Sequence, residues 1–399
     1  MKNVAITGMG AITPLGNGAR TLHTRWAAGE IGIRDGEAPC AEFDPLDFFS
    51  KKEARRADRF TQFGLAAAQE AIAEAGWAEG APYAPERIGC ILGTGIGGIE
   101  TLETNFGVLK DEGPSKVAPL AVPLMMGNAG AAAIAMRHDL RGPVFGVVSA
   151  CAAGANAIGA AVRAIQCGDA DAVLAGGSEA ALTPLARAAF AALDATSTVG
   201  ISRPFDAERD GFIMGEGAGV LVFEDLDAAR ARGAEILGIV RGFGTTCDAH
   251  HLTAPRADGV SAAAAMTAAL ADAEIGADGI DYVNAHGTST PLNDRAETLA
   301  IKNALGQHAH RIPISSTKSA TGHLLGAAGA IEAVATLLTL RDRVVAPTLG
   351  LHTPDEELDL DFVPDVSRPL EVLGDRPAVG VSNSFGFGGH NAVLVLEAA

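Results

Sequence analysis

Residues 145–165 read FGVVSACAAGANAIGAAVRAI, and residues 314–338 read ISSTKSATGHLLGAAGAIEAVATLL. Both segments have the same plan: a short β-branched strand, a turn of small residues, and a helix that opens with glycine and carries the triplet GAA. Two further pairs fall once in each half and in matching order, AITGMGAITPLG with YVNAHGTSTPLN and GEGAGVLVFE with FGGHNAVLVLE. The sequence therefore predicts a duplicated α/β domain.

Short apolar runs alternate with longer alanine-rich segments along the chain. The runs NVAITGMG, RIGCILGTG, DAVLAGGSE and GVLVFED are typical of buried strands, and FTQFGLAAAQEAIAEAGW is typical of a helix. Strands that alternate with helices predict an α/β fold with a largely parallel sheet. The 399 residues exceed the usual size of about 100–200 residues for one domain, so we expect one large domain or two fused domains.

Composition excludes several classes of function. The five cysteines are an odd number without CxxC spacing, which argues against a disulfide framework or a zinc site and favours a reducing cytoplasm. The sequence has neither a signal-peptide pattern nor an apolar run of the roughly 18 residues that a membrane span needs, so we expect neither export nor a membrane protein. The formal net charge of −18 argues against a nucleic-acid surface.

One segment, SKKEARRADRF, is basic in this acidic chain. It carries five cations in nine residues: Lys51, Lys52, Arg55, Arg56 and Arg59. Two interpretations are open, a solvated helix face and a patch that steers an acidic partner to this surface.

Cys151 follows a predicted strand and precedes a predicted helix of small residues. Free N–H groups and the macrodipole at a helix N-terminus favour negative charge, so this position predicts a thiol that is shifted toward thiolate. Small neighbours also leave room for a substrate. The alternative is a buried structural cysteine, which is the interpretation that we give to the other four: Cys40, Cys90, Cys167 and Cys247.

Two histidines lie in glycine-rich turns of the second half: His286 after the run IDYVNA, and His323 near the start of a helix rich in Gly and Ala. One such histidine is more often a core or capping residue, but two in turns of this kind favour a site shared with Cys151. Lys318 and Glu332 flank His323 in sequence, where their charges can fix its tautomer and orientation.

The segment SNSFGFGGHN near the C-terminus places Phe385 and Phe387 in a glycine-flanked loop. Aromatic side chains on such a loop either gate a pocket or anchor the core.

Four segments, in their order and spacing, resemble the β-ketoacyl-[acyl-carrier-protein] synthases, most closely the type II elongating enzymes of fatty-acid synthesis: VSACAAGAN, SRPFDAERDGFIMGEGAG, HGTSTPLND and KSATGHLLGAAGA. The similarity runs from NVAITGMGAITPLGN to SFGFGGHN and so covers essentially the whole chain. It implies a thiolase-like fold, with duplicated βαβαβαββ halves in a layered α-β-α-β-α arrangement, and a homodimer. Residues 1–232 would form the half with the nucleophile, and residues 233–399 the half with both histidines.

The resemblance implies a decarboxylative condensation in fatty-acid elongation. Cys151 would accept an acyl chain from acyl carrier protein, and His286 and His323 would donate hydrogen bonds to the thioester oxygen of malonyl-carrier protein as carbon dioxide leaves. The carbanion equivalent would then attack the Cys151 thioester and release a 3-oxoacyl chain longer by two carbons. The N–H groups of Cys151 and Phe387 would form the oxyanion hole.

The same resemblance implies roles for further positions. Thr288 and Thr290 would contact the phosphopantetheine arm, and Thr253 and His251 would lie near that arm or the gating loop. Ile96 would be the gate of the acyl pocket, with a plain core isoleucine as the alternative. Lys318 and Glu332 would support His323, and Glu297 and Asp294 would lie behind the catalytic residues. The docking surface for the carrier protein would consist of Lys52, Arg55 and Arg56.

Some such enzymes hold a monovalent cation, near residues that match Asn284, Glu297, Glu332, Ser382 and Asn383. The resemblance implies no organic cofactor, because the phosphopantetheine arrives on the carrier protein.

Several alternatives remain beside this interpretation. His390 in FGGHN stands where many bacterial fatty-acid enzymes carry Thr, and this form also occurs in polyketide ketosynthases. The main alternative is therefore the ketosynthase α subunit of a type II polyketide synthase, a heterodimer with a chain-length factor. A non-catalytic chain-length partner would lack the nucleophile that Cys151 supplies. Thiolases have a Cys-His-Cys set of active-site residues and starter-unit enzymes a Cys-His-Asn set, whereas the third position here is His323. A cysteine hydrolase would leave one histidine and Lys318 without a role.

Overall fold

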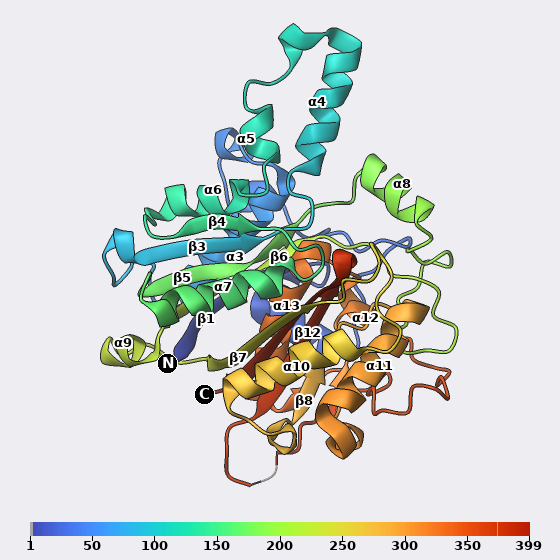
Figure 1. The fold of residues 1–399 in the computed structure, drawn as a ribbon. Helices are drawn as coiled ribbons and strands as arrows, with labels where there is room; N and C mark the ends of the chain where they lie inside the picture. Colours follow the sequence, from blue (N-terminus) through green and yellow to red (C-terminus); the bar gives the residue numbers. More distant parts are fainter. Residues whose placement is uncertain (1–2, 373) are drawn as a thin grey trace.

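The computed structural model describes residues 3–372 and 374–399 (Figure 1). Eleven of the strands in these residues belong to one sheet: β1 (Val4–Thr13), β2 (Gly16–Asn17), β3 (Ile88–Gly93), β4 (Val144–Val147), β5 (Ala172–Glu179), β6 (Gly217–Asp225), β7 (Gly238–Cys247), β8 (Tyr282–Asn284), β9 (Ile314–Ser315), β12 (Val379–Gly386) and β13 (His390–Ala398). A separate pair joins β10 (Val344–Val345) to β11 (Arg368–Pro369).

The order of strands in the sheet contains one pattern twice. It runs β4-β3-β5-β6-β1 through the first half and β7-β13-β12-β8-β9 through the second, with β2 paired to β1. In each half the outer pairings are parallel and the inner pairings antiparallel. The halves meet where residues 4–6 of β1 pair antiparallel with β7. This topology confirms the duplicated α/β fold predicted from the sequence. The expected largely parallel sheet is wrong, because six of the ten strand pairings that the described residues make in it are antiparallel. The pairing of AITGMGAITPLG with YVNAHGTSTPLN is also wrong, because β1 takes the place of β7 in the repeat and β8 takes the place of β3.

Helices form three layers around the two halves of the sheet (Figure 1). In the middle, α7 (Ala153–Cys167) and α13 (Ala328–Asp342) pack against each other and contact strands of both halves. On the outside, α3 (Arg59–Glu74) and α6 (Ala129–His138) cover the first half, and α10 (Val260–Ala273) covers the second with α11 (Pro291–Leu305) beside it. The expected α-β-α-β-α layering is confirmed.

Small residues let the middle helices approach to backbone contact. A Cβ at Gly154 would lie 2.8 Å from the Ala330 nitrogen, and one at Gly329 would lie 2.8 Å from the Ala155 nitrogen. Every residue from 328 to 340 is buried, so α13 is surrounded by protein on all sides. The glycine and alanine repeats of the two segments therefore follow from dense packing between the two halves of the sheet.

The remaining helices connect these layers: α1 (Ala19–Ala27), α2 (Lys51–Ala54), α4 (Ile99–Glu112), α5 (Ala121–Met125), α8 (Pro184–Ala192), α9 (Leu226–Ala231) and α12 (Lys318–Thr321). No helix within residues 3–372 or 374–399 has the length and apolar content of a membrane span.

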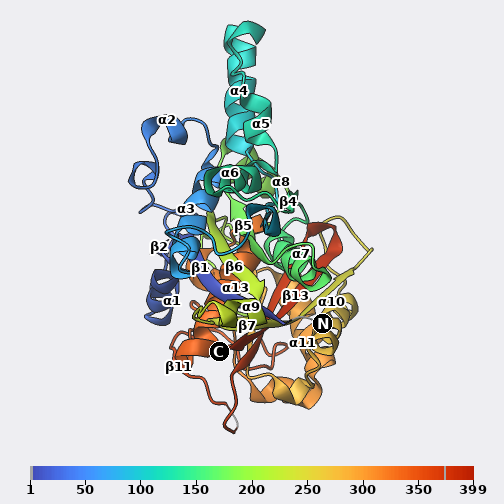
Figure 2. The same cartoon turned by 90° about the vertical axis from the view of Figure 1, so that its left-hand side faces the viewer.

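An arm formed by α4 and α5 stands away from the sheet (Figures 1 and 2). It exposes large apolar side chains, among which Phe106 is 65% exposed and Val122 is 59% exposed. The edge strand β4 exposes Phe145, and Val148 directly after it is 65% exposed. The arm and the sheet edge thus present an apolar surface to solvent.

Candidate active site

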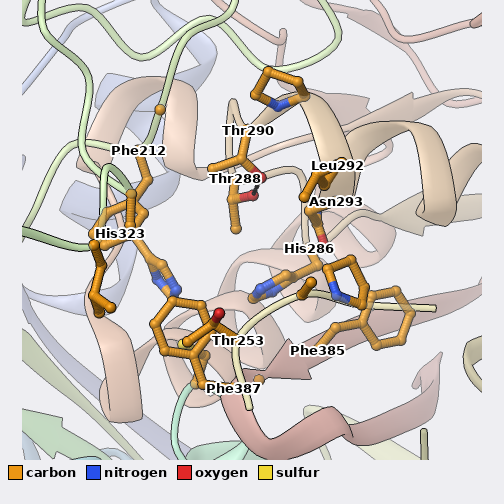
Figure 3. Close-up of a pocket in the computed structure, with 18 of the residues that line it drawn as sticks. Phe212, Thr253, His286, Thr288, Thr290, Leu292, Asn293, His323, Phe385 and Phe387 are labelled. Atoms are coloured by element: carbon orange, nitrogen blue, oxygen red, sulfur yellow. Dashed lines mark hydrogen bonds between the residues drawn. The ribbon is translucent and has the colours of Figure 1, made fainter. Parts of the chain in front are cut away.

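Turns from both halves meet at one pocket (Figure 3). Cys151 lies in the turn between β4 and α7, His286 follows β8, and His323 lies between α12 and α13. The rings of His286 and His323 have their centroids 5.3 Å apart, and the ring of Phe212 lies 5.3 Å from that of His323. Cys151, His286 and His323 line this pocket, whose volume is about 350 Å³, whereas Lys318, the fourth residue predicted to be catalytic, is not among its lining residues.

The Cys151 thiol is almost fully buried. Ala150 before it has φ +51°, a left-handed conformation that turns the chain sharply from strand to helix, and α7 begins at Ala153. Burial raises the pKa of Cys151 to about 11, although the charge of Lys318 and a hydrogen bond from the Phe387 N–H lower it. The predicted shift toward thiolate is therefore wrong, because desolvation outweighs the Lys318 charge and the Phe387 N–H.

Burial and hydrogen-bond geometry together favour neutral imidazoles with the proton on Nε2. Burial lowers the pKa of His286 and of His323 well below the ordinary value, and the Lys318 charge lowers both further. The Leu325 N–H donates to Nδ1 of His323 at 3.2 Å, and the Lys318 ammonium, which has donors only, lies 3.3 Å from Nδ1 of His286. Each Nδ1 is thus an acceptor, so each Nε2–H is a free donor. Figure 3 shows the two rings entering the pocket from opposite sides.

Lys318 is tied to His286 rather than to His323. Its ammonium donates to the carbonyl oxygen of His286 at 2.6 Å and forms an ion pair with Glu332, in which both side chains are 2% exposed. The expectation that Lys318 and Glu332 support His323 is therefore wrong in its partner. These two residues hold His286, and a backbone N–H orients His323.

Two buried carboxylates on α11 shape the turn that carries His286. Glu297 accepts the N–H groups of His286 and Gly287, each at 2.7 Å, and burial raises the pKa of Glu297 to about 7. Asp294 accepts the N–H of Thr288 at 3.1 Å. The helix that follows the turn therefore fixes the backbone of the turn.

The predicted pantetheine and gating residues line the same pocket: Thr253, Thr288, Thr290, Phe385 and Phe387. The hydroxyl oxygens of Thr288 and Thr290 are 2.8 Å apart in a hydrogen bond. Phe385 is buried with its ring centroid 5.7 Å from that of His286. Phe387 begins a glycine turn in which Gly388 has φ +83°.

Two of the predicted substrate-binding residues, Ile96 and His251, are not among those that line the pocket. Ile96 is 43% exposed in the loop after β3, so the alternative of a core isoleucine is wrong. The exposed His251 accepts at Nδ1 from the N–H groups of Thr253 and Ala254, each at 3.1 Å. His251 therefore shapes the turn that brings Thr253 to the pocket.

Several residues at the site received no role from sequence reasoning. Phe212, whose ring lies beside His323, belongs to the segment SRPFDAERDGFIMGEGAG. Asp248 accepts a hydrogen bond from Asn391 at 2.8 Å, and this bond joins the end of β7 to the start of β13. Glu179 ends β5 and is fully buried. The available signal for Glu179 was a single carboxylate that closes the apolar run DAVLAGGSE.

Lys52, Arg55 and Arg56, which we call the docking patch, lie in and directly after α2 and are exposed. Arg59 does not belong to this surface. It pairs with the buried Glu216 at 2.6 Å, so the basic segment seen in the sequence has an exposed part and a structural part.

Buried oxygen atoms without hydrogen-bond partners occur at the expected cation site: Asn284 Oδ1, Glu332 Oε2, Ser382 Oγ and Asn383 Oδ1. Ser382 and Asn284 are register partners on adjacent parallel strands, and Asn383 donates to Glu297 at 3.0 Å. The described residues contain no group of three or more His, Cys, Asp or Glu side chains that suits a metal ion. Neutral oxygens with one free carboxylate oxygen fit a hard cation of low charge.

Residues 1–229 match the family described as Beta-ketoacyl synthase, N-terminal domain, and residues 237–352 match Beta-ketoacyl synthase, C-terminal domain. The chain belongs to the β-ketoacyl synthase family, which confirms the resemblance found in the sequence. Two relatives are named 3-oxoacyl-[acyl-carrier-protein] synthase 2. The protein of Synechocystis sp. is 47% identical over 417 residues, and that of Staphylococcus aureus (strain COL) is 45% identical over 412 residues; each alignment covers 99% of this chain and 98% of the relative.

Solved structures share the fold. A beta-ketoacyl synthase from Burkholderia phymatum has a TM-score of 0.92 at 36% identity and full coverage of both chains. The ishigamide ketosynthase/chain length factor has a TM-score of 0.92 at 31% identity, and a type II polyketide acyl-carrier protein in complex with its ketosynthase gives 0.88 at 30% identity, both over 100% of this chain and 99% of the other. The fold is the thiolase-like fold of ketosynthases, as predicted.

Proposed function

We propose that this chain is an elongating 3-oxoacyl-[acyl-carrier-protein] synthase of fatty-acid synthesis. It condenses malonyl-carrier protein with an acyl chain held on Cys151 and gives a 3-oxoacyl chain two carbons longer. The observation that carries the proposal is one pocket in which a thiol lies beside two neutral imidazoles with free Nε2–H donors. Identity of 45–47% to proteins named 3-oxoacyl-[acyl-carrier-protein] synthase 2, over nearly the whole chain, supports the same reaction.

The first half-reaction moves the acyl chain to Cys151. The sulfur attacks the acyl carbon, the new C–S bond replaces the bond to the pantetheine sulfur, and the thiol proton leaves with the pantetheine thiolate. The N–H groups of Cys151 and Phe387 hold the oxyanion; the Phe387 N–H already bonds to the sulfur. Gly386 keeps this region open, because a Cβ there would lie 3.0 Å from the Cys151 nitrogen.

The second half-reaction uses the two imidazoles. Their Nε2–H groups donate to the malonyl thioester oxygen, which becomes negative as the bond to the carboxylate breaks and carbon dioxide leaves. The enolate carbon attacks the Cys151 thioester, the C–S bond breaks, and the released thiolate takes up a proton. Neutral donors suit this step, and burial keeps the pKa of both histidines low enough to hold them neutral.

Acyl carrier protein is the proposed partner, and its phosphopantetheine enters beside Thr253, Thr288 and Thr290. The docking patch supplies a cationic surface for an acidic carrier protein. A similar ketosynthase has been solved with its acyl-carrier protein, which supports this partner. The five free cysteines are consistent with a cytoplasmic location.

We propose a homodimer in which a second copy covers the arm and β4. The support is an edge strand with the exposed Phe145 and Val148 beside the apolar arm. Phe145→Glu should convert the dimer to a monomer in analytical ultracentrifugation. A variant that stays dimeric would place the interface elsewhere.

The second candidate is the ketosynthase α subunit of a type II polyketide synthase, favoured by His390 and by the similarity to the ishigamide ketosynthase/chain length factor. Mass spectrometry of carrier-bound products, after incubation of the purified chain alone with acyl- and malonyl-carrier proteins, separates the candidates. A product two carbons longer, absent with Cys151→Ala, supports the elongating synthase. Acylation of Cys151 without elongation supports the α subunit, and absence of acylation refutes the nucleophile.

We also propose a structural monovalent cation held by Asn284, Glu332, Ser382 and Asn383, with Glu297 beside them. The support is the set of buried oxygens without partners. Potassium chloride should raise the Tm above its value in choline chloride at equal ionic strength, and equal Tm values would remove the site.

We also propose that the first half ends at residue 232 and the second begins at residue 233, in the turn that joins α9 to β7.

A further inference from the structure

Glu179 is a buried carboxylate that the proposed chemistry does not use. It is 0% exposed, and hydrogen bonds rather than an ion pair satisfy it. One oxygen accepts from the Thr94 hydroxyl at 3.0 Å and the Ile96 N–H at 3.3 Å. The other accepts from the N–H groups of Gly95 at 2.6 Å and Gly326 at 3.0 Å. A buried carboxylate is costly unless it is satisfied in this way, so its position requires a reason.

The four donors come from two separate segments of the chain. Residues 94–97 form the loop after β3 that carries Ile96. Gly326 directly follows Leu325, whose N–H donates to Nδ1 of His323 and so sets the tautomer of that ring. One oxygen of Glu179 bridges these segments, because it accepts from Gly95 and Gly326 together.

The two segments touch backbone to backbone. A Cβ at Gly326 would lie 2.1 Å from the Gly95 nitrogen, and one at Gly177 of β5 would lie 2.5 Å from the Gly326 oxygen. Leu325 has φ +48°, a strained conformation for a leucine, which persists only where the surroundings hold it. A displacement of the Ile96 loop therefore cannot leave the Leu325–Gly326 turn unchanged.

We propose that Glu179 is a positioning residue that couples the Ile96 loop to the turn that orients His323. With Ile96 as the gate of the acyl pocket, the role that the resemblance implies, acyl loading and malonyl decarboxylation share one anchor, so that the length of the acyl chain affects the histidine that acts on malonyl. The inference rests on the proposed condensing function. The Glu179 charge also acts on the nucleophile: burial is the main cause of the raised pKa of Cys151, and Glu179 raises it further.

Two substitutions separate the hydrogen bonds of Glu179. Glu179→Gln retains one acceptor oxygen for Gly95 and Gly326, and its NH₂ group can donate to the Thr94 hydroxyl, but the Ile96 N–H loses its acceptor. Glu179→Asp is one methylene shorter and cannot reach both segments. The matched control is Glu224→Gln, at another carboxylate with 0% exposure, which pairs with Arg232 away from the pocket.

The test measures acyl transfer to Cys151 from carrier proteins with short, medium and long chains, and separately the decarboxylation of malonyl-carrier protein. Glu179→Gln should keep decarboxylation within about threefold of the parent and change the ratio of long-chain to short-chain transfer about tenfold. Glu179→Asp should lower kcat of decarboxylation about tenfold with KM unchanged. The Glu224→Gln control should change all rates by one common factor.

The proposal is overturned if both Glu179 variants change all rates by one common factor, as the control does, or if Glu179→Gln keeps the parental chain-length ratio. Thermal unfolding of each variant shows whether a loss of rate reflects a loss of fold. Failure of the proposed function is a distinct result, because it appears as acyl transfer that persists in Cys151→Ala, whatever the Glu179 variants do.

Discussion

Replacement of Lys318 by Met tests how buried charges hold the catalytic site. The ammonium contacts Nδ1 of His286 at 3.3 Å, donates to the His286 carbonyl oxygen at 2.6 Å and pairs with Glu332. Because both partners of the ion pair are 2% exposed, the variant leaves the Glu332 carboxylate buried without its counterion. We expect Lys318→Met to lower the free energy of unfolding by about 3–5 kcal/mol.

The double variant Lys318→Met/Glu332→Gln separates stability from catalysis. It removes both charges, so its free energy of unfolding should return to within about 1–2 kcal/mol of the parent. In both variants Nδ1 of His286 has lost its donor, so the imidazole is free to carry its proton on either nitrogen. Decarboxylation should therefore fall about 10²-fold in both, since one donor to the developing enolate oxygen is no longer assured.

Equilibrium urea unfolding followed by circular dichroism measures the first effect, and carbon dioxide release from malonyl-carrier protein measures the second. A single variant as stable as the parent would contradict the buried ion pair. A double variant that decarboxylates at the parental rate would show that Lys318 does not orient His286.

Three further predictions concern the nucleophile, the docking patch and the middle layer. Burial raises the pKa of Cys151 to about 11, so the rate of alkylation by iodoacetamide should still increase beyond about pH 9, and a plateau near about pH 7 would indicate a stabilised thiolate. Charge reversal of the docking patch should raise KM for carrier-protein substrates about tenfold and leave KM for small thioester mimics unchanged; equal effects on both would remove the docking role. Gly154→Ala places a Cβ 2.8 Å from a backbone nitrogen of α13 and should cost about 1–3 kcal/mol in urea unfolding. Gly64→Ala is the control, because the atom nearest to the added Cβ would be the end of the Leu92 side chain, 3.3 Å away. The free energy of unfolding of this variant should stay within about 1 kcal/mol of the parent.

Local patterns were enough to predict the duplicated α/β architecture and to single out Cys151, His286 and His323 as candidate catalytic residues. The repeated strand, turn and helix plan is a property of each segment by itself, and burial between the two halves of the sheet requires the small residues that made the repeat visible. Cys151 and His286 each stand in a small-residue turn after a strand, and His323 stands in a glycine-rich turn between α12 and α13, so each has a local signal. Cys151 and His323 lie in equivalent segments of the two halves, after β4 and after β9, whereas His286 follows β8, whose equivalent is β3; all three line one pocket.

Contacts between segments distant in sequence were decided by the tertiary structure. Lys318 stands five residues before His323, and that proximity favoured the wrong partner. The chain turns at Gly322, with φ +65°, and Lys318 instead reaches His286, 32 residues away in sequence.

The same holds for the charge states and for Glu179. A helix N-terminus can be seen in a sequence, but the desolvation that raises the pKa of Cys151 depends on how completely the surrounding segments exclude water. Glu179 joins two turns that lie far from it along the chain, so its role could not be predicted from its neighbours in β5. The sequence by itself therefore determined the fold and the identity of the candidate catalytic residues, whereas burial and long-range contacts decided their partners, tautomers and protonation.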